Sequence, residues 1–128
     1  MPPLISHAMN PMITPKFGQQ FAKEWIEAWN SHDIDRILSH YSEDITMSSP
    51  YIAQVKGTET GTLTGKAAIR NYWTAALQKA PHLSFKLVQT LLGADTVTIY
   101  YRGVRGFAAE VFFFGQDLLV VRAAAHYE

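Results

Sequence analysis

A single carboxylate interrupts the most apolar stretch of the sequence. Glu110 stands within FAAEVFFF, residues 107–114, where neither side of a strand would be solvated. Burying a carboxylate without a partner is costly, so Glu110 must be paired, protonated or close to a pocket mouth. Desolvation raises the pKa of a carboxyl group by up to about 3–5 units, which would make Glu110 a usable acid or base near neutral pH. The alternative is a structural ion pair with Arg102, Arg105 or Arg122.

A second polar residue of interest is Ser49, which closes the segment HYSEDITMSSP just before Pro50. The segment predicts the end of a helix that runs into a short strand over residues 45–48. A serine hydroxyl is a poor base near neutral pH and needs a neighbouring base before it can act. We therefore interpret Ser49 as a small hydrogen-bonding group.

The remaining polar residues give no sign of a metal or phosphate site. The five histidines include no pair at metal-ligand spacing such as HxxxH, so no metal is expected. The segment GTETG, residues 57–61, lacks the preceding strand and the lysine of a phosphate-binding loop, and no cofactor is expected. Arg122 and His126 alternate with the inward positions of the last strand, which predicts that both lie on its outer side.

Composition limits the class of protein. The 128 residues are 48% hydrophobic and 17% charged, with equal numbers of acidic and basic residues, which predicts one globular domain over residues 15–128. Zero net charge without a basic stripe argues against nucleic-acid binding, and no cysteine is present. Residues 1–14 read as an irregular arm rather than a signal peptide, and no apolar run approaches the roughly 18 residues of a membrane span. A cytoplasmic protein with no membrane association is expected.

The first half of the chain predicts three helices and one strand. Apolar residues recur at helical spacing over 17–30, from residue 34 to 41, and over 66–80, where Pro81 ends the last helix. Thr14 with Pro15, and Asp33, are the expected helix starts. Residues 51–64, rich in Gly and Thr, are expected to form a long loop or flexible hairpin that is mobile over a pocket mouth.

After Pro81 the period becomes that of strands, over residues 83–92, 96–102, 107–114 and 118–127. Short connections imply antiparallel pairing, so the sequence predicts an α+β domain with helices on one face of a curved sheet. The opposite face, with Val111 and Phe113 at its centre, is also apolar. A homodimer through this outer sheet face is therefore expected.

The order of these segments resembles a known superfamily. An aromatic helix ending in WNSHD, the segments DRILSHYSEDI and SSP, GKAAIRNYW at the start of the third helix, and the four-strand meander are similar to NTF2-like proteins. The nearest likeness is to SnoaL-like domains and ketosteroid isomerases, over residues 17–127. The resemblance implies a cone-shaped, cystatin-like fold in which three N-terminal helices pack on a curved, mostly antiparallel sheet, with a pocket at the wide end.

The same resemblance implies where a site would lie. The general base of ketosteroid isomerases corresponds to Ser49, the oxyanion-binding tyrosine to Trp25, its supporting tyrosine to Trp73, and a protonated acid to Glu110. Only Glu110 keeps a carboxyl group, so steroid isomerisation by the family mechanism is not expected. Glu110 is the catalytic candidate, and the expected ligand-binding residues are Trp25, Met47, Ser49, Trp73, Ile99, Tyr101, Phe112, Ala123 and Tyr127.

Two kinds of function fit these residues. One is an isomerase, cyclase or lyase of a small hydrophobic molecule, with Glu110 as acid or base. The other is a module that binds an apolar ligand without transforming it, or that assembles through the dimer face. On the last strand Val121, Ala123, Ala125 and Tyr127 share a face, as expected for an apolar cavity closed by a few polar groups.

Overall fold

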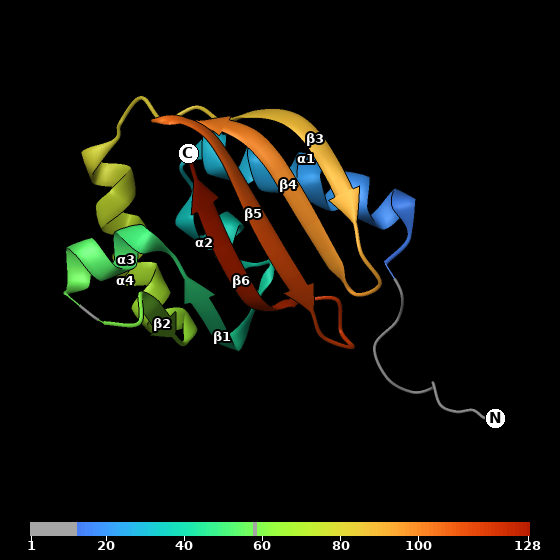
Figure 1. Ribbon diagram of the computed structural model, residues 1–128, viewed down its shortest axis with the longest axis horizontal. Coiled ribbons are helices and arrows are strands. Elements are labelled where there is room, and N and C mark those ends of the chain that lie inside the picture. Colours follow the sequence, from blue (N-terminus) through green and yellow to red (C-terminus); the bar gives the residue numbers. More distant parts are fainter. Residues whose placement is uncertain (1–12, 58) are drawn as a thin grey trace.

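The computed structural model describes residues 13–57 and 59–128. Its helices and strands follow one another in an α+β order, with α1 lying across one side of a strongly twisted sheet (Figure 1). The elements are α1 (Pro15–Ser31), α2 (Ile34–Leu38), β1 (Tyr41–Ser48), α3 (Pro50–Lys56), β2 (Thr62–Thr64), α4 (Lys66–Lys79), β3 (Lys86–Leu92), β4 (Thr96–Gly103), β5 (Gly106–Phe114) and β6 (Val120–Tyr127). The expected fold class is confirmed, although the described residues hold four helices rather than three. The arm expected over residues 1–14 lies outside the described residues except for its last two positions.

The predicted starts of the first two helices are confirmed. The Thr14 hydroxyl accepts a hydrogen bond from the Phe17 backbone N–H at 3.1 Å, and Pro15 occupies the first turn of α1. Such a cap satisfies one of the backbone donors that a helix start leaves open. The Asp33 side chain caps α2 in the same way, accepting from the backbone N–H groups of Asp35 and Arg36.

The expected long loop over residues 51–64 is wrong. Ser49 caps a seven-residue helix, α3, by accepting a hydrogen bond from the Tyr51 backbone N–H at 3.1 Å, and Pro50 fits its first turn. Ile52 anchors this helix because it is fully buried. The short strand β2 then pairs antiparallel with β1, with Leu63 opposite Met47. Composition suggested a loop because the Gly and Thr residues dominate, whereas one cap and one buried isoleucine decide the local structure.

The six strands lie in the order β2-β1-β6-β5-β4-β3, with β1 parallel to β6 and every other pair antiparallel. The register between β5 and β6 shifts after Phe113, which lies opposite Arg122, so that Phe114 lies opposite Val120. A β-bulge of this kind bends a strand and changes which side a residue faces. The expected inward position of Val121 is therefore wrong: Val121 is 38% exposed, and Val120 is buried in its place.

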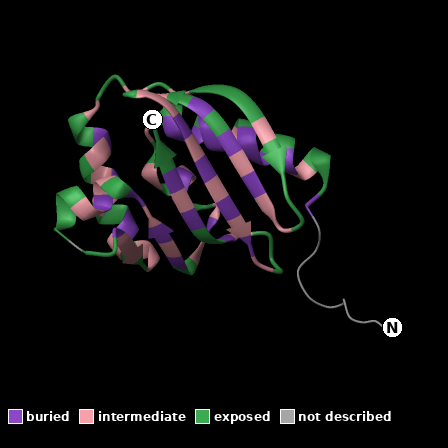
Figure 2. Ribbon diagram, viewed as in Figure 1, coloured by how far each residue is buried: buried purple, intermediate pink, exposed green. Residues whose placement is uncertain are grey.

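Helix α1 fills the concave side of the sheet with aromatic rings. Phe21 packs edge-on against Phe112 and Phe114 of β5, with both centroid distances at 4.9 Å. About one turn further along, Trp25 lies 5.1 Å from Tyr101 of β4 and 5.7 Å from Phe85. Figure 2 views the opposite, outer side of the sheet, where buried and partly buried residues alternate along β4 and β5. The concave side thus holds the core, as the alternation of apolar residues predicts.

One hydrogen bond inside this core can be tested directly. The Trp25 indole N–H donates to the Tyr41 hydroxyl at 3.0 Å, and both residues are fully or almost fully buried. We expect Tyr41→Phe to lower the free energy of unfolding by about 1–3 kcal/mol, because it leaves a buried donor unpaired while keeping the ring. Urea unfolding would measure the change.

A matched control is Tyr100→Phe, since Tyr100 lies at the surface with 38% exposure. Its unfolding midpoint should match that of the wild type within experimental error. Equal midpoints for all three proteins would show that the Trp25–Tyr41 hydrogen bond contributes nothing to stability.

Candidate functional site

A pocket of about 400 Å³ lies between the helices α1, α3 and α4 and the strands β4, β5 and β6, all of which contribute lining residues. Its inner wall is aromatic, and all three tryptophans of the chain belong to it. A volume of this size falls in the range of about 300–1,000 Å³ that small-molecule sites occupy. The long side chains of α1 reach β4 and β5. Helix α4 packs mainly against α2, β1 and β2, so it leaves the space beside β4 and β5 open, and this space is the pocket.

Seven of the ten expected site residues line the pocket, and they come from six different elements or their ends. These are Trp25, Met47, Ser49, Trp73, Tyr101, Glu110 and Tyr127. The other three, Ile99, Phe112 and Ala123, lie buried in the solid core instead. Phe112 faces the same side of β5 as Glu110, but Phe21 of α1 covers it. Strand alternation places these three residues on the inner side of the sheet, yet it cannot tell how far along the cone the empty space begins.

Glu110 is a buried carboxyl group in the wall of this pocket. Its residue exposure is 4%, and burial raises its pKa to about 8. The Tyr101 hydroxyl donates a hydrogen bond to Glu110 Oε1 at 3.4 Å, which lowers the pKa slightly against the larger effect of burial. This distance exceeds the usual range of about 2.5–3.0 Å for such a bond, so the contact holds the carboxyl group only weakly. Glu110 is therefore mainly protonated at neutral pH and close to its titration point.

No ion pair joins Glu110 to another residue within the described part of the chain. The three arginines considered as partners lie over aromatic rings. Arg102 is 5.2 Å from the ring centre of Phe107, and Arg105 is 4.4 Å from that of Tyr51. Arg122, on the outer side as expected, lies 4.4 Å from the ring of Phe113. Cation–π contacts of this kind occupy the arginines at the surface, away from the carboxyl group.

Tyrosine side chains surround Glu110. Burial, together with the charge that Glu110 would carry, raises the pKa values of Tyr41, Tyr72, Tyr101 and Tyr127. These phenols consequently remain protonated at neutral pH and can act as hydrogen-bond donors. Tyr72, absent from the sequence-based site, lines the pocket beside Trp73. Its place on the buried face of the third helix was visible in the sequence, but nothing distinguished it from a core residue.

Ser49 has a structural task at the pocket wall. Its hydroxyl oxygen caps α3, and hydrogen bonding to Ser49 lowers the pKa values of Tyr72 and Tyr127, partly offsetting the rise caused by burial. Two of the histidines are engaged elsewhere: the imidazole of His32 contacts the Leu83 carbonyl, and that of His40 contacts Glu24. Ser49 is thus a helix cap and a partner of phenols, which agrees with its interpretation as a hydrogen-bonding group.

The pocket tryptophans differ in how their indole N–H groups are used. Trp25, which corresponds to the oxyanion-binding tyrosine in the resemblance, donates its N–H to Tyr41 and cannot offer it to a ligand. Trp29 is only 6% exposed, and its Nε1 atom has no hydrogen-bond partner among the described residues. Trp29 therefore holds an unpaired, buried donor beside the pocket, although sequence reasoning left this residue in the core.

Metal ligands do not gather at this site or elsewhere in the part of the chain that the structure describes. No group of three or more His, Cys, Asp or Glu side chains there could hold a metal ion. None of the described helices is long and apolar enough to cross a membrane.

Comparison with known proteins identifies the family. A sequence model of the SnoaL-like domain matches residues 22–127, and the chain belongs to this family. A crystal structure of a SnoaL-like protein of unknown function from Burkholderia thailandensis is 52% identical in sequence, with a TM-score of 0.90 over 91% of this chain and 98% of that one. The resemblance drawn from the sequence is thereby confirmed. No protein with a curated description matches the sequence.

More distant structures share the fold alone. One is SalBIII, an epoxide hydrolase/cyclase-like enzyme with a role in pyran ring formation in the polyether salinomycin. Its sequence is 15% identical to this chain and its TM-score is 0.71, and the match covers 88% of this chain and 92% of SalBIII. A cystatin-like protein of unknown function from Methylobium petroleophilum is 16% identical with a TM-score of 0.72, covering 91% of this chain and 79% of its own. The cystatin-like fold is thus shared, while the chemistry must be argued from the site.

The protonation of Glu110 should be visible in stability. Below the ordinary carboxyl pKa of 4.5, folded and unfolded chains are both protonated, and burial of Glu110 carries no pH-dependent penalty. As pH rises from 4.5 to 8, the unfolded chain releases a proton that the folded chain keeps. The wild type should therefore lose stability relative to Glu110→Gln by about 1.4 kcal/mol per pH unit in this window.

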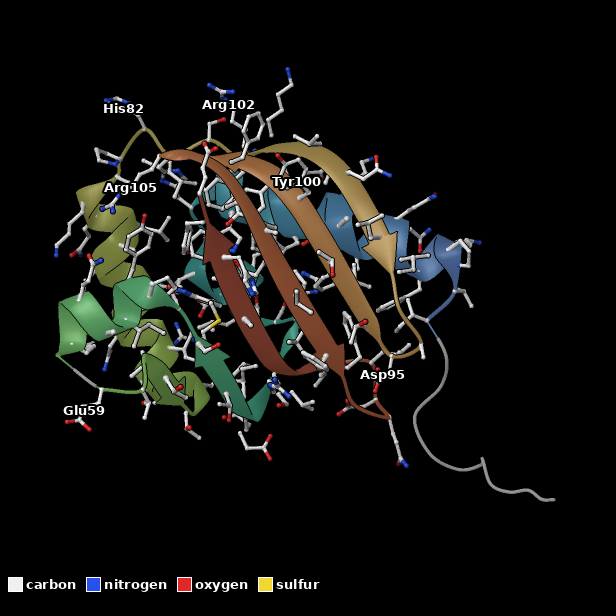
Figure 3. The ribbon with its side chains drawn as sticks, in the orientation of Figure 1. Glu59, His82, Asp95, Tyr100, Arg102 and Arg105 are labelled. Atoms are coloured by element: carbon white, nitrogen blue, oxygen red, sulfur yellow. The ribbon has the colours of Figure 1, made fainter. Side chains whose placement is uncertain are left out.

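Urea unfolding of both proteins across pH 4 to 8 would measure this difference. Glu59→Gln is the control, because Glu59 is exposed (Figure 3) and its replacement should follow the wild type at every pH. A Glu110→Gln protein that is less stable than the wild type by roughly 3–5 kcal/mol at neutral pH would instead indicate a buried ion pair.

Proposed function

We propose that the protein is an acid–base enzyme, an isomerase, cyclase or lyase of a small hydrophobic molecule, with Glu110 as the proton carrier. One observation supports this above all: a carboxyl group with a pKa of about 8 lies in the wall of an aromatic pocket without a cation beside it. Perturbed carboxyl groups in clefts are candidates for catalysis because their proton can be given and taken near neutral pH.

The chemistry needs only a proton and no added reagent. The Glu110 O–H bond breaks, its electron pair stays on the carboxylate, and the proton goes to an oxygen of the bound molecule. The carboxylate then takes a proton from another position of that molecule, which restores the acid. The net result is an isomerisation, a ring closure or an elimination. The Tyr101 hydroxyl, at 3.4 Å from Glu110 Oε1, can shorten its hydrogen bond to stabilise the carboxylate during turnover.

A ligand-binding module without catalysis is the second candidate. The cap formed by the Ser49 hydroxyl and the use of the Trp25 N–H by Tyr41 favour it, since both positions carry reacting groups in ketosteroid isomerases. The distant likeness to an epoxide hydrolase/cyclase-like enzyme is compatible with either function, because it concerns the fold.

An assay in D₂O distinguishes an enzyme from a binding module. It measures turnover of a panel of small apolar ketones, epoxides and hydroxy ketones. Ligands are first found by tryptophan fluorescence, since every tryptophan lies in the pocket wall, and then followed by NMR for conversion or deuterium uptake. We expect turnover by the wild type, and a loss of about 100-fold or more in Glu110→Gln with binding retained. The rate should fall as pH rises through about 8, because the protonated acid is the active form.

The exposed-site variant Glu59→Gln should react like the wild type. Ligands that bind tightly and are recovered unchanged, without deuterium, from the wild-type protein would show a binding module instead. Equal turnover by wild type and Glu110→Gln would remove Glu110 from the mechanism.

We also propose that the outer face of the sheet pairs with a second copy of the chain. Val111 and Phe113 lie half-buried at the centre of this face, Leu91 of β3 is 56% exposed, and α1 lies on the opposite side of the sheet (Figures 1 and 2). Apolar sheet faces are normally covered, and a chain of zero net charge does not repel its copy. Closed two-fold pairing is the commonest assembly of such chains.

Sedimentation at micromolar concentration tests this pairing. The wild type should sediment as a dimer, and Val111→Glu should sediment as a monomer or fail to fold, because it forces a charge into a dry interface. Val55→Glu, on α3 at a 57% exposed position, should remain dimeric. A wild-type monomer at these concentrations would refute the proposal.

A further inference from the structure

The pocket holds a hydrogen-bond donor that nothing in the protein uses. Buried polar groups are almost always paired, and an unpaired one costs free energy. The Trp29 indole N–H is such a group among the described residues, in a wall where the Trp25 N–H already has a partner. The nitrogen is closed off from solvent in the empty pocket, so an acceptor oxygen on a bound molecule would satisfy it only if the Trp29 or Trp73 ring turns on binding. The Trp29 ring lies edge-on to that of Trp73 at 5.1 Å, so a weak contact with this ring is the competing role for the N–H.

The pocket rim is positively charged. Lys56 of α3, Lys79 of α4 and Arg105 of the turn between β4 and β5 all line it. None of these three cations forms an ion pair with a residue that the structure describes. The Glu128 carboxylate also lies at the rim, but one of its oxygens accepts a hydrogen bond from the Phe107 backbone N–H at 3.0 Å. That bond does not cancel the charge of Glu128, but three cations against this one rim carboxylate leave the rim net positive and favourable to anions.

Arg105 is the best-placed cation of the rim. Figure 3 shows it extending from the β4–β5 turn toward the helices, and its guanidinium lies 4.4 Å from the ring centre of Tyr51. The Tyr51 ring in turn lies 4.4 Å from that of Tyr127, whose phenol interacts with Ser49 inside the pocket. A guanidinium stacked on a ring keeps the N–H donors at its edge available, and these fit the two oxygens of a carboxylate.

We propose that the pocket binds amphiphilic carboxylic acids, with the carboxylate on Arg105 at the rim, an apolar body among the tryptophans, and an uncharged oxygen on the Trp29 N–H. The inference rests on the proposed function for the pocket itself and adds the class of molecule that enters it. The orientation follows from desolvation, since a carboxylate placed deep beside Glu110 would lose its hydration without gaining a cation. At the rim it keeps both water and a positive partner.

Three matched probes test the proposal by isothermal titration: 4-oxo-4-phenylbutanoate, its primary amide, and 4-phenylbutanoate. The first has the carboxylate and the ketone, the second lacks the charge, and the third lacks the ketone. The wild type should bind the keto acid roughly three- to tenfold more tightly than the amide, in line with one partly exposed charge pair, and added salt should reduce this preference.

Arg105→Gln should abolish the preference for the acid over the amide. Arg102→Gln is the matched control, because Arg102 lies nearby on the same hairpin, stacks on Phe107 in a similar way and does not line the pocket. It should retain the full preference. Glu110→Gln should also retain it, so the rim is tested separately from catalysis.

NMR of the three indole N–H signals tests the Trp29 contact. The signal that disappears in Trp29→Phe is assigned to Trp29. The keto acid should move the Trp29 signal downfield, while 4-phenylbutanoate should not, and Trp29→Phe should remove the advantage of the ketone. An unmoved signal would show that the N–H stays on the Trp73 ring and would overturn this part.

The rim site would be overturned if the wild type bound acid and amide equally, or if the preference for the acid survived in Arg105→Gln. Neither result would decide whether Glu110 performs acid–base chemistry, which has its own test. Failure of all three probes to bind the wild type would overturn the ligand class. Turnover of a neutral ligand in that case would still support the proposed function, so the two failures remain distinct.

Discussion

A single helix, α1, has to fill the concave side of a bent six-stranded sheet. The position of the site depends on the point along the sheet at which α1 no longer fills that side. The phenylalanine rings of α1 meet those of β5 at close edge-on distances, which leaves no free space at that end. At the other end the larger tryptophans reach Tyr101 and Phe85, and α4 closes the volume incompletely. Close packing is the rule in protein interiors, and a pocket of about 400 Å³ in so small a domain supports the proposal that this protein binds a small molecule.

Glu110 takes its character from this geometry. The same carboxyl group in solvent would ionise at an ordinary pKa, whereas the aromatic walls withhold water and the arginines stack on rings at the surface. Tyr101 donates a hydrogen bond to it, and the charge that Glu110 would carry raises the pKa values of four neighbouring tyrosines, none of which can neutralise a carboxylate. The energetic cost of keeping such a group buried is understandable if its proton is used.

The family comparison explains what is kept and what is changed. The chain shares the SnoaL-like domain with a half-identical structure of unknown function, and shares only the fold with enzymes of other sequence. In this chain the Ser49 hydroxyl caps α3, and the Trp25 N–H is donated to Tyr41. The shared fold therefore does not by itself fix the chemistry of the pocket, which depends on the side chains of this chain.

The sequence by itself determined the order of most elements, the inward side of most strand residues and the unusual position of Glu110. Helical and strand periods, two helix caps and the segment FAAEVFFF carry this information locally, because each depends on residues only a few positions apart. The sequence missed α3, since its cap and its buried Ile52 are weaker signals than the glycines that follow. It also misplaced Val121, because a bulge arises from the pairing of two strands.

Only the tertiary structure decided which inward residues meet empty space. Ile99 and Phe112 alternate correctly yet lie in the core, while Trp29 and Arg105 gain their roles from elements far away in the chain. Alternation along a strand fixes a direction, but a cavity is defined by the distance between two packed layers. That distance depends on every side chain between α1, α4 and the sheet, and it therefore cannot be read from any one segment.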